Sequence, residues 1–378
     1  MGETPIKLIY VVNEASFLIS HRLALATEAL ARGFQVMVVC AEGTGEEHLA
    51  QYGLSYQTMP LTRSGLNPLQ ELRTLKSIRK VYEAERPDIV HHVTIKPVLY
   101  GTRAANRAGI RAVVNAVPGM GFVFIRRGVL AAIRRAFVNL LYRLALSHRN
   151  MQVIFQNQDD MEGFISHAIV DREQSTLIRG SGVDLETFRC AAEPRGAMTF
   201  LLVGRMLRHK GVREFVEAAK TLRKTRPDWR FQLVGDVDAG NPASLTQEEL
   251  GKWQDAGLVE WLGHRSDVPQ LMANAHVVCL PSYREGLPKT LLEAAATGRA
   301  MVSSDAAGCR EVVRNEVTGL VVPVRDADSL ARAMFRLGED KELRQRFGRA
   351  ARAKAEAVFS VEDVVSHTFR VYERLLSK

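Results

Sequence analysis

Apolar and polar positions alternate in blocks along the first half of the chain. Short, β-branched apolar runs predict buried strands, and longer stretches between them, such as 21–32 and 69–86, show apolar residues at helical spacing. Strands that alternate with helices in this way predict a parallel sheet covered on both faces. The strands predicted in this half are 6–12, 35–40, 89–93, 111–117 and a run that begins at Met151.

The same alternation begins again near residue 199. It predicts strands at 199–204, 231–236, 259–263, 276–282, 300–305 and 319–323, and then helices at 327–337, 339–357 and 361–378. We therefore expect an α/β protein with two doubly wound, Rossmann-like parallel-sheet domains that face each other across a cleft, with ligands at the carboxyl ends of the strands. The predicted domains are 1–178 and 179–357, and the helix at 358–378 is expected to pack back on the first domain.

Length, composition and charge fit this architecture. The 378 residues suit two domains, and the net charge of +9 suits a polyanionic partner: nucleic acid, a phosphorylated small molecule or an anionic membrane face. The four cysteines form no CxxC pair, which indicates buried thiols in a reducing compartment. Because the sequence has no signal-peptide pattern and no apolar run of about 18 residues, we expect a cytoplasmic protein.

Two cations follow the first strand of the second half. That strand ends at Gly204, Arg205 and Lys210 lie in the loop, and Gly211 opens the next helix. An arginine can hold two phosphate oxygens at once, and a lysine adds a point charge. The pair predicts a clamp that stabilises a departing diphosphate, and a solvated basic loop is the alternative.

Two glutamates, Glu285 and Glu293, follow the strand at 276–282. Glu285 lies in a loop, and Pro288 fits the first turn of the helix that contains Glu293. The N–H groups at that helix start can take a phosphate, and a carboxylate can hold a sugar hydroxyl or a ribose diol. The predicted donor-binding residues are Gly204, Arg205, Lys210, Glu285, Gly286, Leu287, Pro288 and Glu293, and the predicted catalytic groups among them are Glu285, Arg205 and Lys210.

These residues resemble the retaining glycosyltransferases of family 4, which have the GT-B fold. Glu285 and Glu293 match the E-x7-E signature of those enzymes, and GRMLRHKG at 204–211 resembles their GR…KG segment. GSGVD at 180–184 and GCREVVRNEVTGLVVP at 308–323 resemble the family at the same relative places. The resemblance implies two facing Rossmann-like domains, a nucleotide-sugar donor and retention of configuration, with Glu285 on the transferred sugar and Glu293 on the ribose.

Segments of the first half resemble one bacterial branch of this family. They are NEASFLISHR (13–22), HHVTIKPVLYG (91–101) and NAVPGMGFVF (115–124), together with VGDVDAGNPAS (234–244) in the second half. Members of this branch extend sugars on undecaprenyl diphosphate, and the most similar add N-acetylgalactosamine or N-acetylglucosamine. The resemblance therefore implies a UDP-sugar donor and a polyprenyl-diphosphate-linked saccharide acceptor, as in O-antigen, capsule or protein-glycan precursor synthesis.

The first domain departs from the family in its polar groups. Many members have a Gly-Gly turn after the first strand and a sugar-facing histidine after the fourth, and this chain has neither. His91 and His92 are neighbours on a strand, so at most one faces the cleft, and a structural role is equally open for each histidine. The acceptor or cleft candidates are Asn13, Phe17, His21, His92, Lys96, Gly119, Met120 and Gly121.

A basic amphipathic helix is predicted at 128–149. Its arginines are not interrupted by acids, and leucines such as Leu140 and Leu144 recur at helical spacing. This pattern favours binding to an anionic membrane surface, on the inner face of the cytoplasmic membrane, and the alternative is that the leucines face the core. The predicted membrane residues are Arg126, Arg127, Arg134, Arg135 and Arg143.

Asp236 and Asp238 form a DxD sequence. In the other glycosyltransferase fold, the aspartates of such a sequence hold a divalent cation against the donor diphosphate. Because Arg205 and Lys210 already offer positive charge, we interpret the DxD as a loop and expect neither metal nor cofactor.

The expected activity is retaining, metal-independent transfer of N-acetylgalactosamine or N-acetylglucosamine from UDP to an undecaprenyl-diphosphate-linked saccharide. No nucleophile is evident opposite Glu285, which favours a front-face displacement. One alternative is a nucleotide-sugar epimerase or hydrolase on the same fold. The other is a basic nucleic-acid-binding protein, although the sequence has only 7% aromatic residues and no recognition motif.

Overall fold

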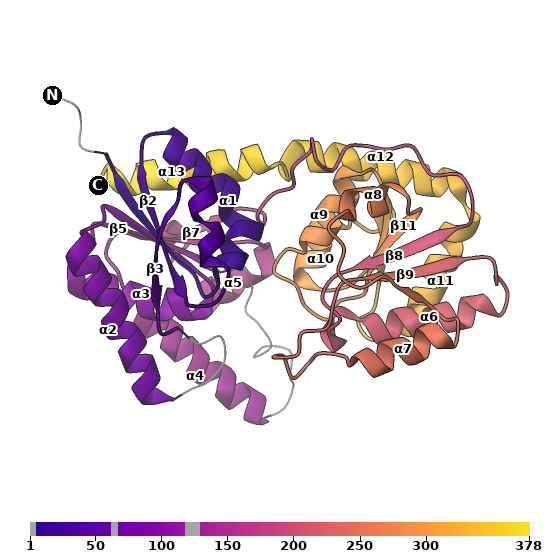
Figure 1. The fold of residues 1–378 in the computed structure, drawn as a ribbon, viewed down its shortest axis with the longest axis horizontal. Coiled ribbons are helices and arrows are strands. Elements are labelled where there is room, and N and C mark those ends of the chain that lie inside the picture. Colours follow the sequence, from indigo (N-terminus) through magenta and orange to yellow (C-terminus); the bar gives the residue numbers. More distant parts are fainter. Residues whose placement is uncertain (1–4, 62–66, 118–128) are drawn as a thin grey trace. The chain divides into compact units, whose positions relative to one another are not determined.

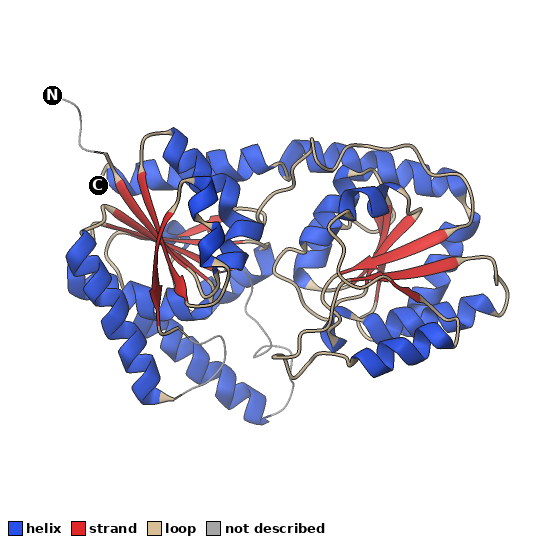
Figure 2. Cartoon of the chain, viewed as in Figure 1, coloured by secondary structure: helices blue, strands red, loops and turns tan. Residues whose placement is uncertain are grey.

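The computed structural model describes residues 5–61, 67–117 and 129–378, and the chain divides into two compact α/β units (Figure 1). Unit 1 comprises the chain up to Ser181 together with Glu362–Lys378, and unit 2 comprises Gly182–Val361. In each unit, helices cover both faces of one parallel sheet (Figure 2). The predicted fold class, two doubly wound parallel-sheet domains, is confirmed.

The sheet of unit 1 has seven strands in the order β3-β2-β1-β4-β5-β6-β7. Its central strands are buried and mostly apolar, with His91 and His92 in β4 and Asn115 in β5 as buried polar exceptions. The outer strands β3 and β7 were not predicted: β3 has four exposed residues, and β7 is only three residues long. The strands are β1 (Lys7–Val11), β2 (Gln35–Ala41), β3 (Ser55–Met59), β4 (Ile89–Val93), β5 (Ala112–Val117), β6 (Met151–Phe155) and β7 (Ser175–Leu177).

The C-terminal helix α13 completes the core of unit 1 and runs along it in yellow in Figure 1. Phe369 and Tyr372 of α13 are buried in the same cluster as Leu8 and Tyr10 of β1. The Tyr10 and Tyr372 hydroxyls lie 3.0 Å apart. The helices of unit 1 are α1 (Ala15–Ala31), α2 (Pro68–Glu85), α3 (Ile95–Ala108), α4 (Val129–Ala145), α5 (Gln158–Ser166) and α13 (Val361–Leu376).

The sheet of unit 2 has six strands in the order β10-β9-β8-β11-β12-β13. They are β8 (Thr199–Val203), β9 (Arg230–Val234), β10 (Glu260–Trp261), β11 (Val277–Leu280), β12 (Ala300–Ser304) and β13 (Gly319–Val322). The helices are α6 (Val212–Arg223), α7 (Gln247–Asp255), α8 (Val268–Ala273), α9 (Lys289–Ala296), α10 (Ala307–Val312), α11 (Ala327–Glu339) and α12 (Lys341–Val358).

Both sheets reverse their strand order at the same place. In unit 1 the first strand, β1, pairs with the fourth, β4, and in unit 2 the first strand, β8, pairs with the fourth, β11. At such a switch point the connections after the two strands leave in opposite directions, which opens a crevice at the carboxyl ends. The loops after β8 and β11 contain most of the predicted donor-binding residues.

Candidate functional site

An ion pair between Lys210 and Glu285 joins the loops that follow β8 and β11. Lys210 Nζ donates to Glu285 Oε1 at 2.7 Å, and the two side chains are only 19% and 12% exposed. Ser282 Oγ lies 2.6 Å from the same carboxylate oxygen. The Glu285 carboxylate is thus held through one oxygen, Oε1, by a cation and a hydroxyl.

The polypeptide backbone also ties these two loops together. Tyr283 N–H donates to the His209 carbonyl at 2.8 Å, and Ser282 Oγ lies 3.0 Å from the same carbonyl. Ser282 has one proton, and the nearer, charged carboxylate of Glu285 is the stronger acceptor for it. Gly211 makes the close approach possible: its φ is +76°, and a Cβ there would lie 2.1 Å from the Pro281 carbonyl oxygen.

The His209 side chain adds no positive charge to this cluster at neutral pH. Burial is the main cause that lowers the pKa of His209 to about 4; the neighbouring Lys210 and Arg205 contribute to this shift, and Glu285 opposes it. The cations of the β8 loop are therefore Arg205, Arg208 and Lys210, with a neutral imidazole between the last two.

Arg205 is held by the loop after β9. Arg205 Nη1 donates to Asp238 Oδ2 at 2.7 Å, and the arginine side chain is 53% exposed. Asp236 receives the N–H of Val237 on its own side chain. Asp238, the second aspartate of the DxD, thus orients Arg205. Within residues 5–61, 67–117 and 129–378, no three His, Cys, Asp or Glu side chains cluster as a metal site would require.

Glu293 lies one turn inside α9 and is nearly buried. Burial raises the pKa of Glu293, and Lys289, whose Nζ is 3.6 Å away, partly offsets that effect. Pro288 was expected in the first turn of this helix and instead directly precedes it, and Gly298, with a φ of +74°, follows its end. Thr290 Oγ1 donates to the Val203 carbonyl at 3.1 Å, which fixes the start of α9 beside the end of β8.

Helix α10 contacts the backbone of the loop that contains Glu285. Gly308 N–H donates to the Glu285 carbonyl at 3.3 Å. A Cβ at Gly308 would lie 2.2 Å from the Gly286 carbonyl oxygen, so the helix reaches the loop only because this residue is glycine.

The structure brings the predicted donor residues of unit 2 to one edge of one sheet. Sequence reasoning did not identify three groups that position them: Ser282, Asp238 as the partner of Arg205, and Glu214, which accepts the Tyr283 hydroxyl at 2.5 Å. Ser282 stands three positions before Glu285, at the end of the predicted strand 276–282, and this spacing was an available signal.

The prediction that His92 is an open cleft group is corrected by its burial. His92 is fully buried, with Nε2 2.8 Å from the Tyr82 hydroxyl and Nδ1 2.8 Å from Asn115 Oδ1. His91 points to the opposite face of the sheet, where Nδ1 lies 2.6 Å from the Tyr372 hydroxyl. Alternation along β4 sends the two rings into the two cores that cover the sheet, so both histidines are structural.

The remaining unit 1 candidates lie in different settings. Asn13 follows β1 and is partly buried. The rings of Phe17 and His21 stack on α1 with centroids 4.2 Å apart. Lys96 Nζ lies 2.7 Å from Glu71 Oε1, with both side chains mostly buried. Gly119, Met120, Gly121, Arg126 and Arg127 lie outside the described residues, and nothing is described of the Arg134 and Arg135 side chains in α4.

The C-terminal half of α4 exposes apolar side chains. Leu140 is 49% exposed and Leu144 is 56% exposed, one turn apart, while Tyr142 is buried. Arg143 is exposed and donates to the His167 carbonyl. The leucine stripe is therefore not only a core face. No helix in the described part of the chain has both the length and the apolar character to span a membrane.

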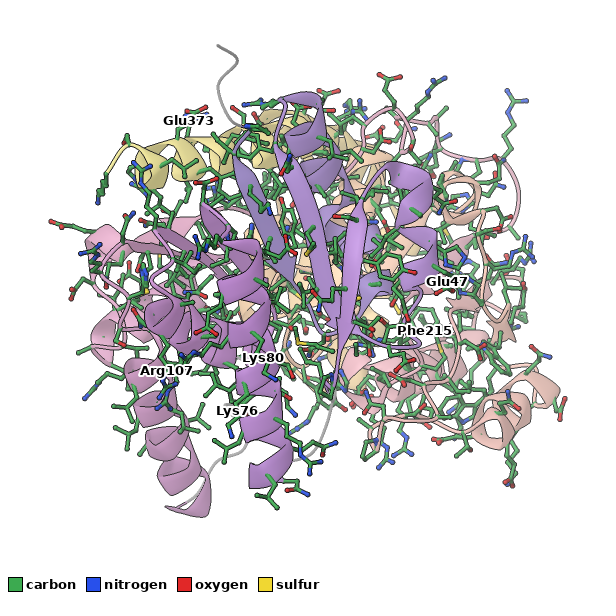
Figure 3. The ribbon with its side chains drawn as sticks, turned by 60° about the vertical axis from the view of Figure 1, so that its left-hand side comes forward. Glu47, Lys76, Lys80, Arg107, Phe215 and Glu373 are labelled. Atoms are coloured by element: carbon green, nitrogen blue, oxygen red, sulfur yellow. The ribbon has the colours of Figure 1, made fainter. Side chains whose placement is uncertain are left out.

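Helix α2 has a second surface of this kind. Leu69, Leu72, Arg73, Lys76 and Lys80 are all exposed, and their spacing places them on one face of the helix. Figure 3 labels Lys76 and Lys80 along α2. We call these five residues the α2 face: two leucines in the first turns and three cations after them.

Two family models match the chain. The model of glycosyl transferases group 1 matches residues 186–354, and the glycosyl transferase 4-like model matches residues 7–157. The first match contains every residue of the Lys210–Glu285 cluster.

Relatives match over most of the chain. A Campylobacter jejuni protein, N,N'-diacetylbacillosaminyl-diphospho-undecaprenol alpha-1,3-N-acetylgalactosaminyltransferase, is 30% identical over 356 residues, which cover 90% of this chain and 92% of the relative. An Escherichia coli protein, UDP-Gal:alpha-D-GlcNAc-diphosphoundecaprenol alpha-1,3-galactosyltransferase, is 29% identical over 327 residues, covering 82% of this chain and 81% of the relative.

The fold is shared with solved structures. Anabaena HepE, crystallised in complex with UDP and glucose, matches with a TM-score of 0.76 at 20% identity, covering 97% of this chain and 99% of that one. The two family models and the relatives show that the chain belongs to the group 1, family 4-like glycosyltransferases, and the solved structure shows the same fold. The chain is a glycosyltransferase.

Proposed function

We propose that the chain transfers N-acetylgalactosamine or N-acetylglucosamine from UDP to an undecaprenyl-diphosphate-linked saccharide, with retention of configuration and without a metal. The observation that carries this proposal is the Lys210–Glu285 pair at the switch point of unit 2, where a cation and a carboxylate can meet one nucleotide-sugar. The names of the two relatives support the lipid-linked acceptor. The Escherichia coli relative is named for galactose, so the N-acetylhexosamine rests on the Campylobacter relative and on the sequence resemblance.

On this proposal, Arg205 and Lys210 bind the diphosphate of the donor. Lys210 uses one of its three N–H donors on Glu285, which leaves two for phosphate oxygens. Fixed cations aimed at the charge that develops on a leaving group lower the barrier without reorganising during the reaction. These side chains supply the charge that a divalent cation supplies elsewhere, which supports a metal-independent reaction.

The carboxylates orient the two sugars of the donor. Oε1 of Glu285 is engaged by Lys210 and Ser282, so Oε2 is the oxygen proposed to accept a hydroxyl of the transferred sugar. Glu293 would accept the ribose hydroxyls from α9. Its raised pKa reflects the cost of burying a charge, a cost that two hydroxyl donors would reduce.

Retention is proposed to follow from a front-face displacement. The bond from the sugar's anomeric carbon to the diphosphate oxygen breaks, and the acceptor hydroxyl oxygen bonds to that carbon on the same face. Arg205 and Lys210 stabilise the negative charge that develops on the departing diphosphate oxygen, and this oxygen takes the proton of the acceptor hydroxyl. Both relatives are named alpha-1,3 transferases, and an alpha product from an alpha-linked UDP-sugar is retention.

The acceptor's lipid suggests why unit 1 exposes leucines among cations. Leu140 and Leu144 on α4, beside Arg143, and the α2 face can enter the headgroup region of an anionic leaflet. Each cation near such a surface contributes about 1 kcal/mol, so several together give reversible binding. We place the protein on the inner face of the cytoplasmic membrane on this basis.

The activity is tested with a donor panel. UDP-GalNAc, UDP-GlcNAc, UDP-Gal and UDP-Glc are each incubated with short-chain polyprenyl-diphosphate saccharides, and the product linkage is read by NMR. We expect an alpha-linked product from an N-acetylhexosamine donor in the presence of EDTA. Free sugar released from donor alone, without transfer to any acceptor, would instead support the hydrolase.

Membrane binding is tested with the double variant Leu140→Asp/Leu144→Asp in co-sedimentation with vesicles that contain anionic lipid. We expect the bound fraction to fall at least tenfold, because two charged groups would have to enter the headgroup region. Transfer to a water-soluble, short-chain acceptor should stay within twofold of wild type. Unchanged vesicle binding, or equal losses in both assays, would contradict the proposal for α4.

A further inference from the structure

Thr94, the residue between β4 and α3, has an unusual backbone conformation. Its φ is +78° and its ψ is 165°, a region that is populated almost only by glycine. Of the non-glycine residues with positive φ in the described parts of the chain, Thr94 is the only one with a β-branched side chain, which makes its conformation the most strained. A glycine would adopt this conformation at no steric cost, so the threonine side chain needs a reason to be there.

The hydroxyl of Thr94 makes no hydrogen bond to the described part of the chain. Threonine often caps the helix that it precedes, but here the side chain makes no cap hydrogen bond to α3. Thr94 Oγ1 is inaccessible to solvent and has no hydrogen-bond partner among the described residues. Asn13 Oδ1, in the loop after β1, is also inaccessible to solvent and has no hydrogen-bond partner among the described residues. Unsatisfied buried oxygens are costly and are commonly satisfied by water or a ligand.

These two residues lie at neighbouring strand ends. The last pair in the register of β1 with β4 is Val11 with His92, and Asn13 and Thr94 each come two residues later. They therefore stand at the switch point of the unit 1 sheet. In unit 2, the loops at the corresponding place, after β8 and β11, carry Lys210 and Glu285.

We infer that Thr94 and Asn13 form a subsite for the acceptor saccharide, where they hydrogen-bond a group that can donate: a pyranose hydroxyl or an acetamido N–H. This inference rests on the proposed function. An amide oxygen can only accept, and a threonine hydroxyl can donate or accept, so a donating sugar group satisfies both. Both residues are partly exposed although the two oxygens are covered, so the proposed contact requires the side chains to rotate when the sugar binds.

The test compares Thr94→Val, Thr94→Gly and Thr94→Ser with wild type. Valine keeps the shape and removes the hydroxyl, glycine also removes the strain, and serine keeps the hydroxyl. We expect kcat/KM for the polyprenyl-diphosphate saccharide to fall about tenfold in the valine and glycine variants and to stay within twofold in serine, with the KM for the UDP-sugar unchanged. The thermal midpoint of Thr94→Gly should equal or exceed that of wild type, which separates lost binding from lost folding.

Asn13→Ala provides the second variant, with the same loss expected for the acceptor and none for the donor. Acceptors with and without the acetamido group distinguish the two donating groups, because the loss disappears in the variant when the acceptor already lacks its partner. If wild type transfers sugar while Thr94→Val keeps its kcat/KM for the acceptor, a water fills this position and the inference is wrong. If wild type transfers to no lipid-linked saccharide, the proposed function and the inference fall together.

Discussion

The two units share a sheet topology but use their polar residues differently. In unit 2 the polar groups stand in loops just beyond the strands: Lys210 after β8 and Glu285 after β11. In unit 1 the most conspicuous polar pair, His91 and His92, stands within β4 itself and is buried. A residue inside a central strand of a doubly wound sheet points into one of the two cores, whereas the loops that follow the strands, such as those that carry Lys210 and Glu285, lie at the edge where such sheets bind ligands. Position relative to the strand end, more than residue type, separates the buried polar residues of unit 1 from the loop residues of the proposed donor site in unit 2.

The difference has an electrostatic consequence. The Lys210–Glu285 cluster keeps opposite charges in partial contact with solvent, where substrate can exchange for one partner. His91 and His92 of unit 1 are kept neutral at neutral pH, because burial lowers the pKa of His92 to about 4 and that of His91 well below its usual range. The proposed site in unit 2 thus contains charged side chains that solvent can reach, whereas the buried histidines of unit 1 are uncharged at neutral pH.

The largest effect is expected on kcat, at the Lys210–Glu285 pair of unit 2. Lys210→Ala removes the cation from the diphosphate and leaves the Glu285 carboxylate with Ser282 alone, so kcat should fall about 100- to 1000-fold. Single-turnover transfer assays measure the loss, and the thermal midpoint reports the fold. Lys252→Ala, which removes an exposed lysine on α7 that pairs with Glu248, is the matched control and should keep wild-type rates. Wild-type turnover in Lys210→Ala would end the case for this site.

The next effect concerns stability in unit 1. Folded His92 stays neutral down to about pH 4, whereas the unfolded chain protonates near pH 6.5, so the unfolded state gains a proton between these values. The stability that neutral His92 provides is complete above pH 6.5 and is lost as the pH falls, by about 3 kcal/mol at pH 4. Urea unfolding of wild type and His92→Gln at pH 7 and pH 4 measures it.

We expect His92→Gln to be less stable than wild type at pH 7, because the bonds to Tyr82 and Asn115 are altered. The gap between the two proteins should then narrow toward pH 4. A gap that stays constant with pH would show that His92 is charged or solvated in the folded protein.

The smallest effect compares two buried serines of unit 2. Ser282→Ala frees the Glu285 carboxylate on one side, and kcat should fall about tenfold. Ser303, on β12, is fully buried, and its hydroxyl has no partner among the described residues. Ser303→Ala should therefore leave kcat unchanged and keep or raise the free energy of unfolding, by up to about 1 kcal/mol. Equal loss of kcat in both variants would mean that packing, rather than the Glu285 hydrogen bond, is what Ser282 provides.

Much of the fold could be predicted because its central strands are short and mostly apolar. The predicted strand 89–93 matches β4, where apolar residues flank two histidines, and the predicted helix 361–378 matches α13 closely because its apolar residues recur at helical spacing. β3 escaped prediction because SYQTM is an edge strand with polar, exposed positions, and β7 because three residues give no period. Pattern reasoning works where burial is two-sided and fails at sheet edges.

For the site, sequence reasoning found the charged loop residues but not the groups that hold them. Lys210 and Glu285 stand out as charges at strand ends, whereas Ser282 matters only through a contact across the fold. His92 was misplaced because a histidine reads as polar, and only the contacts with Tyr82 and Asn115 reveal that its ring is satisfied inside the core. Thr94 was not predicted at all, because the residue type does not reveal that its backbone has a positive φ.

The division of unit 1 between both ends of the chain bears on synthesis. Unit 2 occupies one continuous stretch, Gly182–Val361, and has all its residues as soon as that stretch leaves the ribosome. Unit 1 begins emerging first, yet its core lacks Phe369 and Tyr372 until the last helix follows. The unit made first is thus finished last, and a chain cut short within α13 would have all the residues of unit 2 but would leave part of the hydrophobic core of unit 1 uncovered.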